Sequence, residues 1–221
     1  MEVTEIMKDI AIYGAGGLGR EVACLLNKIN ETEGPMWNLI GFFDDGKEKG
    51  TAVSHFGELL GGLEELNKWK DALCVVLCFG NPAIIRTVRS RLINLSLVYP
   101  NIIDPDFSIG DPLTFSIGEG NIIKGGCGVT TEVRIGNYNL LNGSVRIGHD
   151  AVIGNYNVLM PGVRVSGEVS LGDNNLLGAD SFVKQQLRVG SNVTLSPLSA
   201  LLTKPKDGNT YIGNPAKLFK F

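Results

Sequence analysis

The sequence contains few of the residues that carry metal and redox chemistry. It has two histidines and four cysteines among 221 residues. Because two histidines do not complete a three-histidine zinc site, no metal is expected. The cysteines form no CxxC pair, and we interpret all four as buried, reduced thiols. They are Cys24, Cys74, Cys78 and Cys127.

Charge is also sparse. Charged residues make up 19% of the chain and the net charge is −3, so the chain lacks the basic surface that binds nucleic acid. No apolar run approaches the roughly 18 residues of a membrane-spanning helix, and no leader pattern begins the chain. Since hydrophobic residues reach 43%, we expect a folded cytoplasmic protein without a nucleic-acid or membrane partner.

Glycine, in contrast, is abundant, and the second half of the chain repeats every six residues. From Ile117 to Leu201, each of fifteen positions spaced by six is aliphatic. Glycine often follows the aliphatic residue, and a small or medium residue stands four positions after it, as at Cys127 and Ser181. A period of six fits neither a helix nor a hairpin meander. It predicts a short strand and a corner, repeated.

Three such units make one triangular coil, so fifteen units predict five coils with aliphatic ladders in the interior. Ile103 and Ile109 predict an earlier, less regular coil. Asparagine tolerates positive φ, and we assign six asparagines to the corners. They are Asn121, Asn137, Asn139, Asn155, Asn174 and Asn192. Residues 100–221 are therefore interpreted as a parallel β-helix.

The first half of the chain predicts a small Rossmann-like α/β domain over residues 1–99. An apolar strand leads into the glycine-rich turn Gly14–Gly19, and a helical pattern follows. A second strand ends at Asp44-Asp45, a third covers 72–79 before Gly80, a helix covers 83–92, and a last strand lies near 95–98. Backbone N–H groups in such a turn can approach a phosphate. The short domain favours a mononucleotide or sugar nucleotide over NAD.

Two alternatives stay open for these motifs. The glycines can serve tight turn packing alone, and the two acids can form a solvated turn. If the acids bind a ligand, their carboxylates would accept hydrogen bonds from a nucleobase imide or from ribose hydroxyls at a strand end.

Of the two histidines, His149 is the candidate general base. It stands two residues after core-facing Ile147, whereas His55 lies in a loop-like stretch and is interpreted as a surface residue. Imidazole is suited to removing a proton near neutral pH. Asp150 would fix its tautomer, which requires a bend because neighbouring side chains of a strand point to opposite faces. The backbone N–H of Gly167 is the candidate donor to an oxyanion.

The two halves together resemble the bacterial UDP-4-amino-sugar N-acetyltransferases and the related sialic acid O-acetyltransferases. The resemblance covers nearly the whole chain. Its motifs are the turn Gly14–Gly19, Gly41-Phe42-Phe43-Asp44-Asp45, Phe79-Gly80-Asn81, the repeat with Gly148-His149-Asp150, Pro161-Gly162 and Gly213-Asn214-Pro215-Ala216-Lys217. It implies that the β-helix is left-handed, that acetyl-CoA is the cosubstrate, and that a homotrimer holds active sites between subunits.

The resemblance also implies roles for individual residues. The acceptor-binding positions are Gly16, Gly17, Leu18, Asp44, Asp45, Gly80 and Asn142. The catalytic positions are His149, Asp150 and Gly167. The acetyl-CoA positions are Val158, Gly167, Ala179 and Pro197. The phosphates of coenzyme A would meet Lys184, Lys204 or Lys206.

Two positions depart from the family pattern, which usually has histidine where Leu18 and Val158 stand. We expect direct N-acetylation of a UDP-4-amino-6-deoxy sugar for surface glycan synthesis. The alternatives are O-acetylation of sialic acid or serine, and a non-catalytic β-helix binding protein. The γ-class carbonic anhydrases share the β-helix but need three histidines for zinc.

Overall fold

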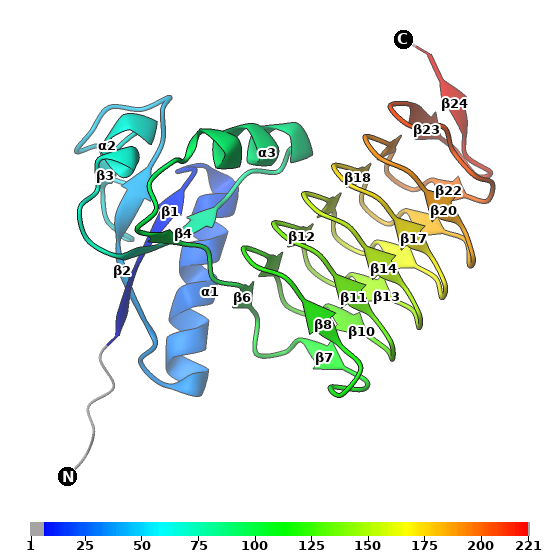
Figure 1. Ribbon diagram of the computed structural model, residues 1–221, viewed down its shortest axis with the longest axis horizontal. Helices are drawn as coiled ribbons and strands as arrows, with labels where there is room; N and C mark the ends of the chain where they lie inside the picture. The colour runs from blue at the N-terminus through cyan, green and yellow to red at the C-terminus, as the bar shows by residue number, and fades with distance from the viewer. Residues whose placement is uncertain (1–6, 221) are drawn as a thin grey trace. The chain divides into compact units, whose positions relative to one another are not determined.

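The computed structural model describes residues 7–220 and divides them into two compact units (Figure 1). The first, here called the α/β unit, comprises the described residues up to Gly80 together with Ile84–Pro105. The second, the β-helix unit, comprises Asn81–Ala83 and the chain from Asp106 onward.

The α/β unit is built on one parallel sheet with the strand order β3-β2-β1-β4-β5. Its elements are β1 (Lys8–Tyr13), α1 (Gly17–Glu33), β2 (Trp37–Phe43), β3 (Leu59–Gly61), α2 (Leu63–Asn67), β4 (Leu73–Leu77), α3 (Pro82–Arg91) and β5 (Leu97–Val98). The sequence anticipated this order, apart from β3 and the short helix α2.

Burial explains why β1 lies in the middle of this sheet. Its residues Ile10, Ala11 and Ile12 are completely buried, as expected for a parallel strand covered on both faces. Helix α1 turns Val22, Leu25, Leu26 and Ile29 to the core and leaves its opposite side in solvent. The chain order reverses between β1 and β4, and the loops beyond the strand ends there form the usual ligand crevice of such sheets.

In the β-helix unit, every predicted aliphatic position from Ile117 to Leu201 ends a two-residue strand. The strands are β6 (Ile102–Ile103), β7 (Ser108–Ile109), β8 (Ser116–Ile117), β9 (Ile122–Ile123), β10 (Gly128–Val129), β11 (Arg134–Ile135), β12 (Leu140–Leu141), β13 (Arg146–Ile147), β14 (Val152–Ile153), β15 (Val158–Leu159), β16 (Arg164–Val165), β17 (Ser170–Leu171), β18 (Leu176–Leu177), β19 (Phe182–Val183), β20 (Arg188–Val189), β21 (Thr194–Leu195) and β22 (Ala200–Leu201). The earlier coil predicted at Ile103 and Ile109 is thus confirmed.

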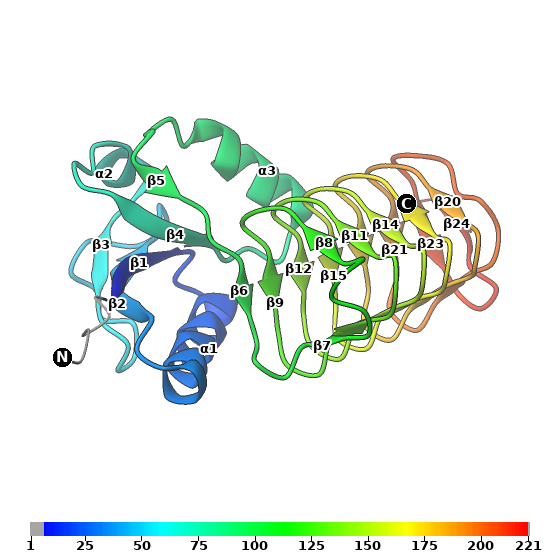
Figure 2. The ribbon, with the colours of Figure 1, turned by 60° about the horizontal axis from the view of Figure 1, so that its bottom comes forward.

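The short strands assemble into three parallel stacks. From β11 to β22, each strand pairs with the strand three positions earlier, and the paired residues are 18 apart in sequence, as Ile135 is from Ile153. Figure 2 shows these coils stacked along the unit. The chain ends in β23 (Thr210–Ile212), which continues one stack in parallel, and β24 (Lys217–Phe219), which pairs antiparallel to it.

The interior of the coils contains a ladder of buried amides as well as the aliphatic ladders. Asn121, Asn139, Asn157 and Asn175 are at most 1% exposed. The Oδ1 atoms of the first three accept hydrogen bonds of 2.8–3.0 Å from the backbone and side-chain N–H groups of the asparagine 18 residues later. The ladder thereby pairs polar groups that would otherwise be buried without partners.

This ladder corrects the prediction that six asparagines occupy corners. Asn121 and Asn139 belong to the interior, and only Asn174 and Asn192 of the six adopt positive φ. Most left-handed corners carry other residues, including Glu132, Tyr138, Ser144, Asp150, Tyr156 and Glu168. The corner conformation is imposed by the coil, so it does not select asparagine at every position.

The cysteine prediction needs one correction, and the membrane prediction can be compared with the helices. Cys78 and Cys127 are buried and Cys74 is half-buried, but Cys24 is exposed on the solvent side of α1. All four are free thiols. Within residues 7–220, no helix combines the length and apolar character needed to cross a membrane.

The amide ladder predicts a stability effect. Replacing Asn157 by Ala removes the acceptor of two N–H groups of Asn175, at 2.9 Å each, and a donor to Asn139. We expect the free energy of unfolding to fall by about 3 kcal/mol in urea titration, because buried polar groups lose their partners. The exposed corner variant Asn192→Gly serves as the control and should change it by less than about 1 kcal/mol. Equal effects would argue against the ladder as a stabilising feature.

Candidate active site

The glycine-rich turn after β1 contains glycines of two kinds. A Cβ on Gly14 would lie 2.6 Å from the carbonyl oxygen of Cys78, and one on Gly19 would collide with the carbonyl of Gly14. These two glycines are required for packing. A Cβ on Gly16 or Gly17 would meet nothing within 4 Å, so packing does not explain glycine there.

The open glycines stand at the start of α1. Gly16 is the N-cap residue and provides no side-chain hydrogen bond, and the first turn of the helix carries no acidic residue. The N-terminal N–H groups of a 17-residue helix are therefore left without a side-chain cap, in a region of positive helix dipole. Leu18, where the family usually has histidine, is half-buried.

Asp44 and Asp45 follow β2 and connect the loops at this end of the sheet. Asp44 accepts from the N–H of Ala15 (2.9 Å) and from the N–H of Gly46 (2.9 Å). Asp45 accepts from the N–H of Leu63 (2.7 Å) and from the hydroxyl of Tyr13 (2.8 Å). The predicted acids are thus held by specific bonds, which a purely solvated turn does not provide.

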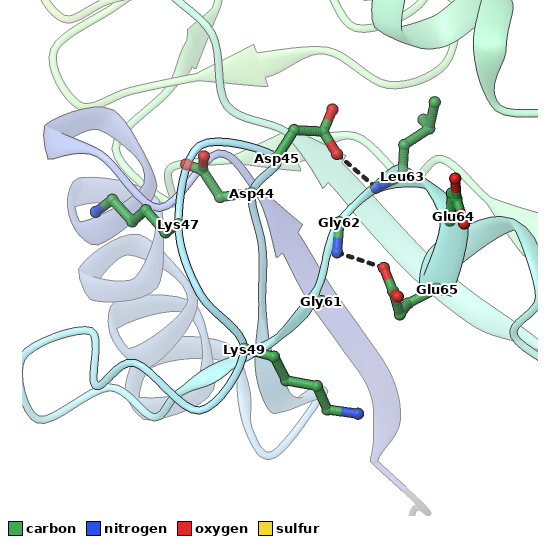
Figure 3. A pocket seen from close by; sticks show the side chains of 9 residues that line it. All are labelled: Asp44, Asp45, Lys47, Lys49, Gly61, Gly62, Leu63, Glu64 and Glu65. Carbon is green, nitrogen blue, oxygen red and sulfur yellow. Dashed lines mark hydrogen bonds between the residues drawn. The ribbon is translucent and has the colours of Figure 1, made fainter.

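A pocket of about 290 Å³ lies beside the two acids (Figure 3). Its lining adds Lys47 and Lys49 to Asp44 and Asp45, together with residues Gly61 to Glu65 around the start of α2. Lys47 donates to the carbonyl of Ala15 (2.9 Å), so this cation is tied to the glycine-rich turn. The sequence analysis missed the lysines and α2, because only the strand-end acids gave a recognisable pattern.

Tyr13 supports Asp45 from the end of β1. Its ring is buried and packs edge-on against Phe79, with ring centroids 5.5 Å apart. Burial raises the pKa of the Tyr13 hydroxyl well above its ordinary value, and the hydrogen bond to Asp45 and the charge of that carboxylate raise it further. Tyr13 is therefore a neutral donor that orients the Asp45 carboxylate. Gly80, which follows Phe79, leaves open space where a Cβ would stand.

His149 and Asp150 form a bonded pair at a corner of the β-helix unit. The corner joins β13 to β14, and Asp150 adopts φ +56° there. This left-handed conformation brings neighbouring side chains together, so that Nδ1 of His149 lies 2.8 Å from Oδ2 of Asp150. Because a carboxylate only accepts, Nδ1 carries the hydrogen and Nε2 is left with its lone pair. About half of each side chain is exposed.

Gly167 lies against the His149 ring, one coil further on. A Cβ at this position would lie 2.5 Å from Nε2 and 2.7 Å from Cε1 of His149, so a larger residue would displace the ring. The carbonyl of His149 accepts from the N–H of Glu168 (2.7 Å). Hydrogen bonds from Gln185 and Gln186 lower the pKa of the Glu168 carboxyl, which therefore stays anionic beside the pair.

The remaining expected positions are spread along the β-helix unit. Asn142 accepts a hydrogen bond from Lys124 (2.8 Å), and Val158 is completely buried in β15. Ala179 is half-buried and Pro197 is exposed near the C-terminal coils. His55 is exposed and stacks on Phe56, as expected for a surface residue. Among residues 7–220, no three His, Cys, Asp or Glu side chains gather as a metal site would require.

Comparison with known proteins identifies the type of both parts. Residues 9–92 match the PglD N-terminal domain. No curated protein matches the sequence. Among solved structures, the acetyltransferase domain of PglB from Neisseria gonorrhoeae FA1090 in complex with acetyl coenzyme A is 25% identical, with a TM-score of 0.83, over 97% of this chain and 100% of that one.

Two further structures are similar over similar lengths. WeeI from Acinetobacter baumannii AYE is 25% identical, with a TM-score of 0.84, over 97% of this chain and 100% of that one. PerB from Caulobacter crescentus, in complex with CoA and GDP-perosamine, is 20% identical, with a TM-score of 0.78, over 97% and 99%. The predicted resemblance to hexapeptide-repeat sugar acetyltransferases is confirmed. So is the predicted fold class, an α/β subdomain followed by a left-handed parallel β-helix.

The raised pKa of Tyr13 predicts a pH dependence of stability. Because the hydroxyl stays protonated more readily in the folded chain, its contribution is complete below about pH 10 and is lost as pH rises above that value. In Tyr13→Phe this loss is absent. We expect urea midpoints measured from about pH 9 to pH 11 to fall less steeply in the variant than in the wild type. Parallel slopes would contradict the assignment, and Tyr211→Phe provides a tyrosine control.

The contact between Gly167 and His149 predicts a change in the imidazole. ¹⁵N NMR should show Nδ1–H and unprotonated Nε2 for His149 in the wild type, since His55→Ala leaves a single ring to assign. In Gly167→Ala the added methyl group displaces the ring, and we expect the Nδ1–H signature to be lost, as in Asp150→Ala. A wild-type ring protonated only at Nε2 would refute the geometry.

Proposed function

We propose that this chain is an acetyl-CoA-dependent N-acetyltransferase that acetylates the amino group of a UDP-4-amino-6-deoxy sugar for bacterial surface glycan synthesis. In this proposal residues 1–99 bind the acceptor and residues 100–221 carry out the transfer. The single observation that carries it is the His149–Asp150 pair, held at a corner of a hexapeptide-repeat β-helix. Support comes from the acetyl coenzyme A complex of the similar PglB domain.

The reaction needs one base and one oxyanion donor. The acceptor amine attacks the thioester carbonyl, and Nε2 of His149 takes the amine proton as the carbon–nitrogen bond forms. The oxygen of the tetrahedral intermediate accepts from the backbone N–H of Gly167. When the carbon–sulfur bond breaks, the imidazolium returns the proton to the coenzyme A thiolate. The acetylated amine and free coenzyme A leave, and the histidine is neutral again.

Asp150 serves this cycle as a positioning residue. Its bond to Nδ1 keeps Nε2 free for the acceptor and favours the imidazolium that forms during attack. The pair is half-exposed, so the attraction between its charges is weakened by solvent. Its main contribution is therefore orientation of the ring.

The acceptor nucleotide is assigned to the α/β unit. The uncapped start of α1, with open surface at Gly16 and Gly17, suits a diphosphate. Asp44 and Asp45 retain lone pairs for ribose hydroxyls or a nucleobase imide. The PerB structure, which contains GDP-perosamine, supports a nucleotide-linked amino sugar as the acceptor class.

The cosubstrate is assigned to the β-helix unit. Backbone groups around Gly167, Ala179 and Pro197 would pair with the amides of acetyl-CoA. Val158 contributes packing beneath this surface, because its side chain is buried. A cytoplasmic homotrimer with active sites between subunits completes the proposal.

The decisive experiment is a thiol-release assay with acetyl-CoA against UDP- and dTDP-linked amino sugars, sialic acid and serine. We expect turnover with a UDP-4-amino sugar, and a loss of about 10²–10⁴-fold in kcat/KM for His149→Ala, the range for removing a general base. His55→Ala is the matched control and should retain full activity. Unchanged turnover in His149→Ala would refute the base assignment, and preference for sialic acid or serine would refute N-acetylation.

A further inference from the structure

A second pocket, of about 410 Å³, lies on the face of the β-helix unit formed by β7, β10, β13 and β16. Its lining combines small residues with two cations. The residues relevant here are Gly128, Arg146, Gly148, Arg164 and Ser166. No residue that lines this pocket is acidic.

The two arginines are direct neighbours without a protein partner. Arg146 and Arg164 face each other in register on the parallel strands β13 and β16, which places their backbones about 4.8 Å apart. Within residues 7–220, neither guanidinium forms a hydrogen bond or ion pair with the protein. Like charges in this arrangement repel, which disfavours the folded chain unless an anion joins them.

The backbone beside them directs one of these cations along the pocket. A Cβ on Gly128 would collide with Nη1 of Arg146, so the guanidinium lies across β10 instead of extending into solvent. Glycine at position 128 is therefore required by the placement of Arg146. The arrangement is specific, unlike that of the exposed Arg188 on β20.

The pocket adjoins the proposed base. Two of its lining residues, Gly148 and Ser166, immediately precede His149 and Gly167 in the chain. A ligand held by the arginines would thus lie next to the reacting groups. The thioester end of acetyl-CoA carries a neutral pantetheine arm, which keeps its phosphates away from that position.

We propose that Arg146 and Arg164 together bind an oxyanion of the acceptor and so determine acceptor specificity. The oxyanion is either the diphosphate of a nucleotide sugar or the carboxylate of an acidic sugar. Paired guanidinium groups suit both, because each presents planar donors to two oxygens. This inference rests on the proposed acetyl transfer and adds that the acceptor is anionic close to the acetylated group.

The test compares the double variant Arg146→Gln/Arg164→Gln with Arg188→Gln as the matched control. We expect the double variant to raise KM for the acceptor by about 10- to 100-fold, with KM for acetyl-CoA unchanged within about 2-fold and kcat little affected. The control should match the wild type. A free amino sugar without diphosphate, or the methyl ester of sialic acid, should be insensitive to the substitutions and identifies which oxyanion is bound.

Direct binding separates this inference from the proposed function. Calorimetric titration with inorganic pyrophosphate and with N-acetylneuraminate requires no turnover. Weaker binding of either probe to the double variant than to the wild type supports the site, even if no acceptor is acetylated and the proposed function fails. Equal binding in both proteins, no binding to the wild type, or a rise in KM for acetyl-CoA alone would overturn it.

Discussion

The stacking of each coil on the coil 18 residues earlier determines the β-helix unit. Two-residue strands are too short to be stable alone, so each depends on in-register neighbours above and below. The period also brings identical side chains together, as in the interior amide ladder and in the Asn137–Asn155 bonds nearer the surface. Because backbone and side-chain bonds share one repeat, a change in one coil acts on the coils beside it.

The same constraint builds the candidate catalytic groups from ordinary corners. Every coil turns through a left-handed residue, and at Asp150 this turn places a carboxylate beside the preceding histidine. The next coil supplies a glycine at the stacked position, which leaves room for the ring. The chemistry therefore depends on which residues occupy consecutive levels of one corner, and no special backbone is needed.

The strand positions were predictable, because an uninterrupted aliphatic period leaves no other arrangement that buries all fifteen residues. The glycine-rich turn and the acids at the end of β2 were predictable from strand–turn–helix patterning. The asparagine assignment failed at Asn121 and Asn139, since the preference for positive φ competes with burial in an amide ladder, and periodicity alone does not distinguish the two.

Other features needed three-dimensional placement. Cys24 was expected to be buried, but it lies on the solvent side of α1, where a residue of ambiguous polarity gives no signal. Helix α2 has five residues and no clear period. The arginine pair had a visible signal, because Arg146 and Arg164 are separated by 18 residues and each precedes an aliphatic position. That signal acquires meaning only once the coil length is known.

The 18-residue repeat also governs how a chain of this kind can change length. Inserting one residue within a coil would turn later aliphatic side chains from the interior to the solvent, whereas gaining or losing 18 residues leaves the phase intact. Whole coils beyond β20 can thus be added or removed without altering the level at which His149 stands. The length of the β-helix and the chemistry of its corner are therefore heritable as separate traits.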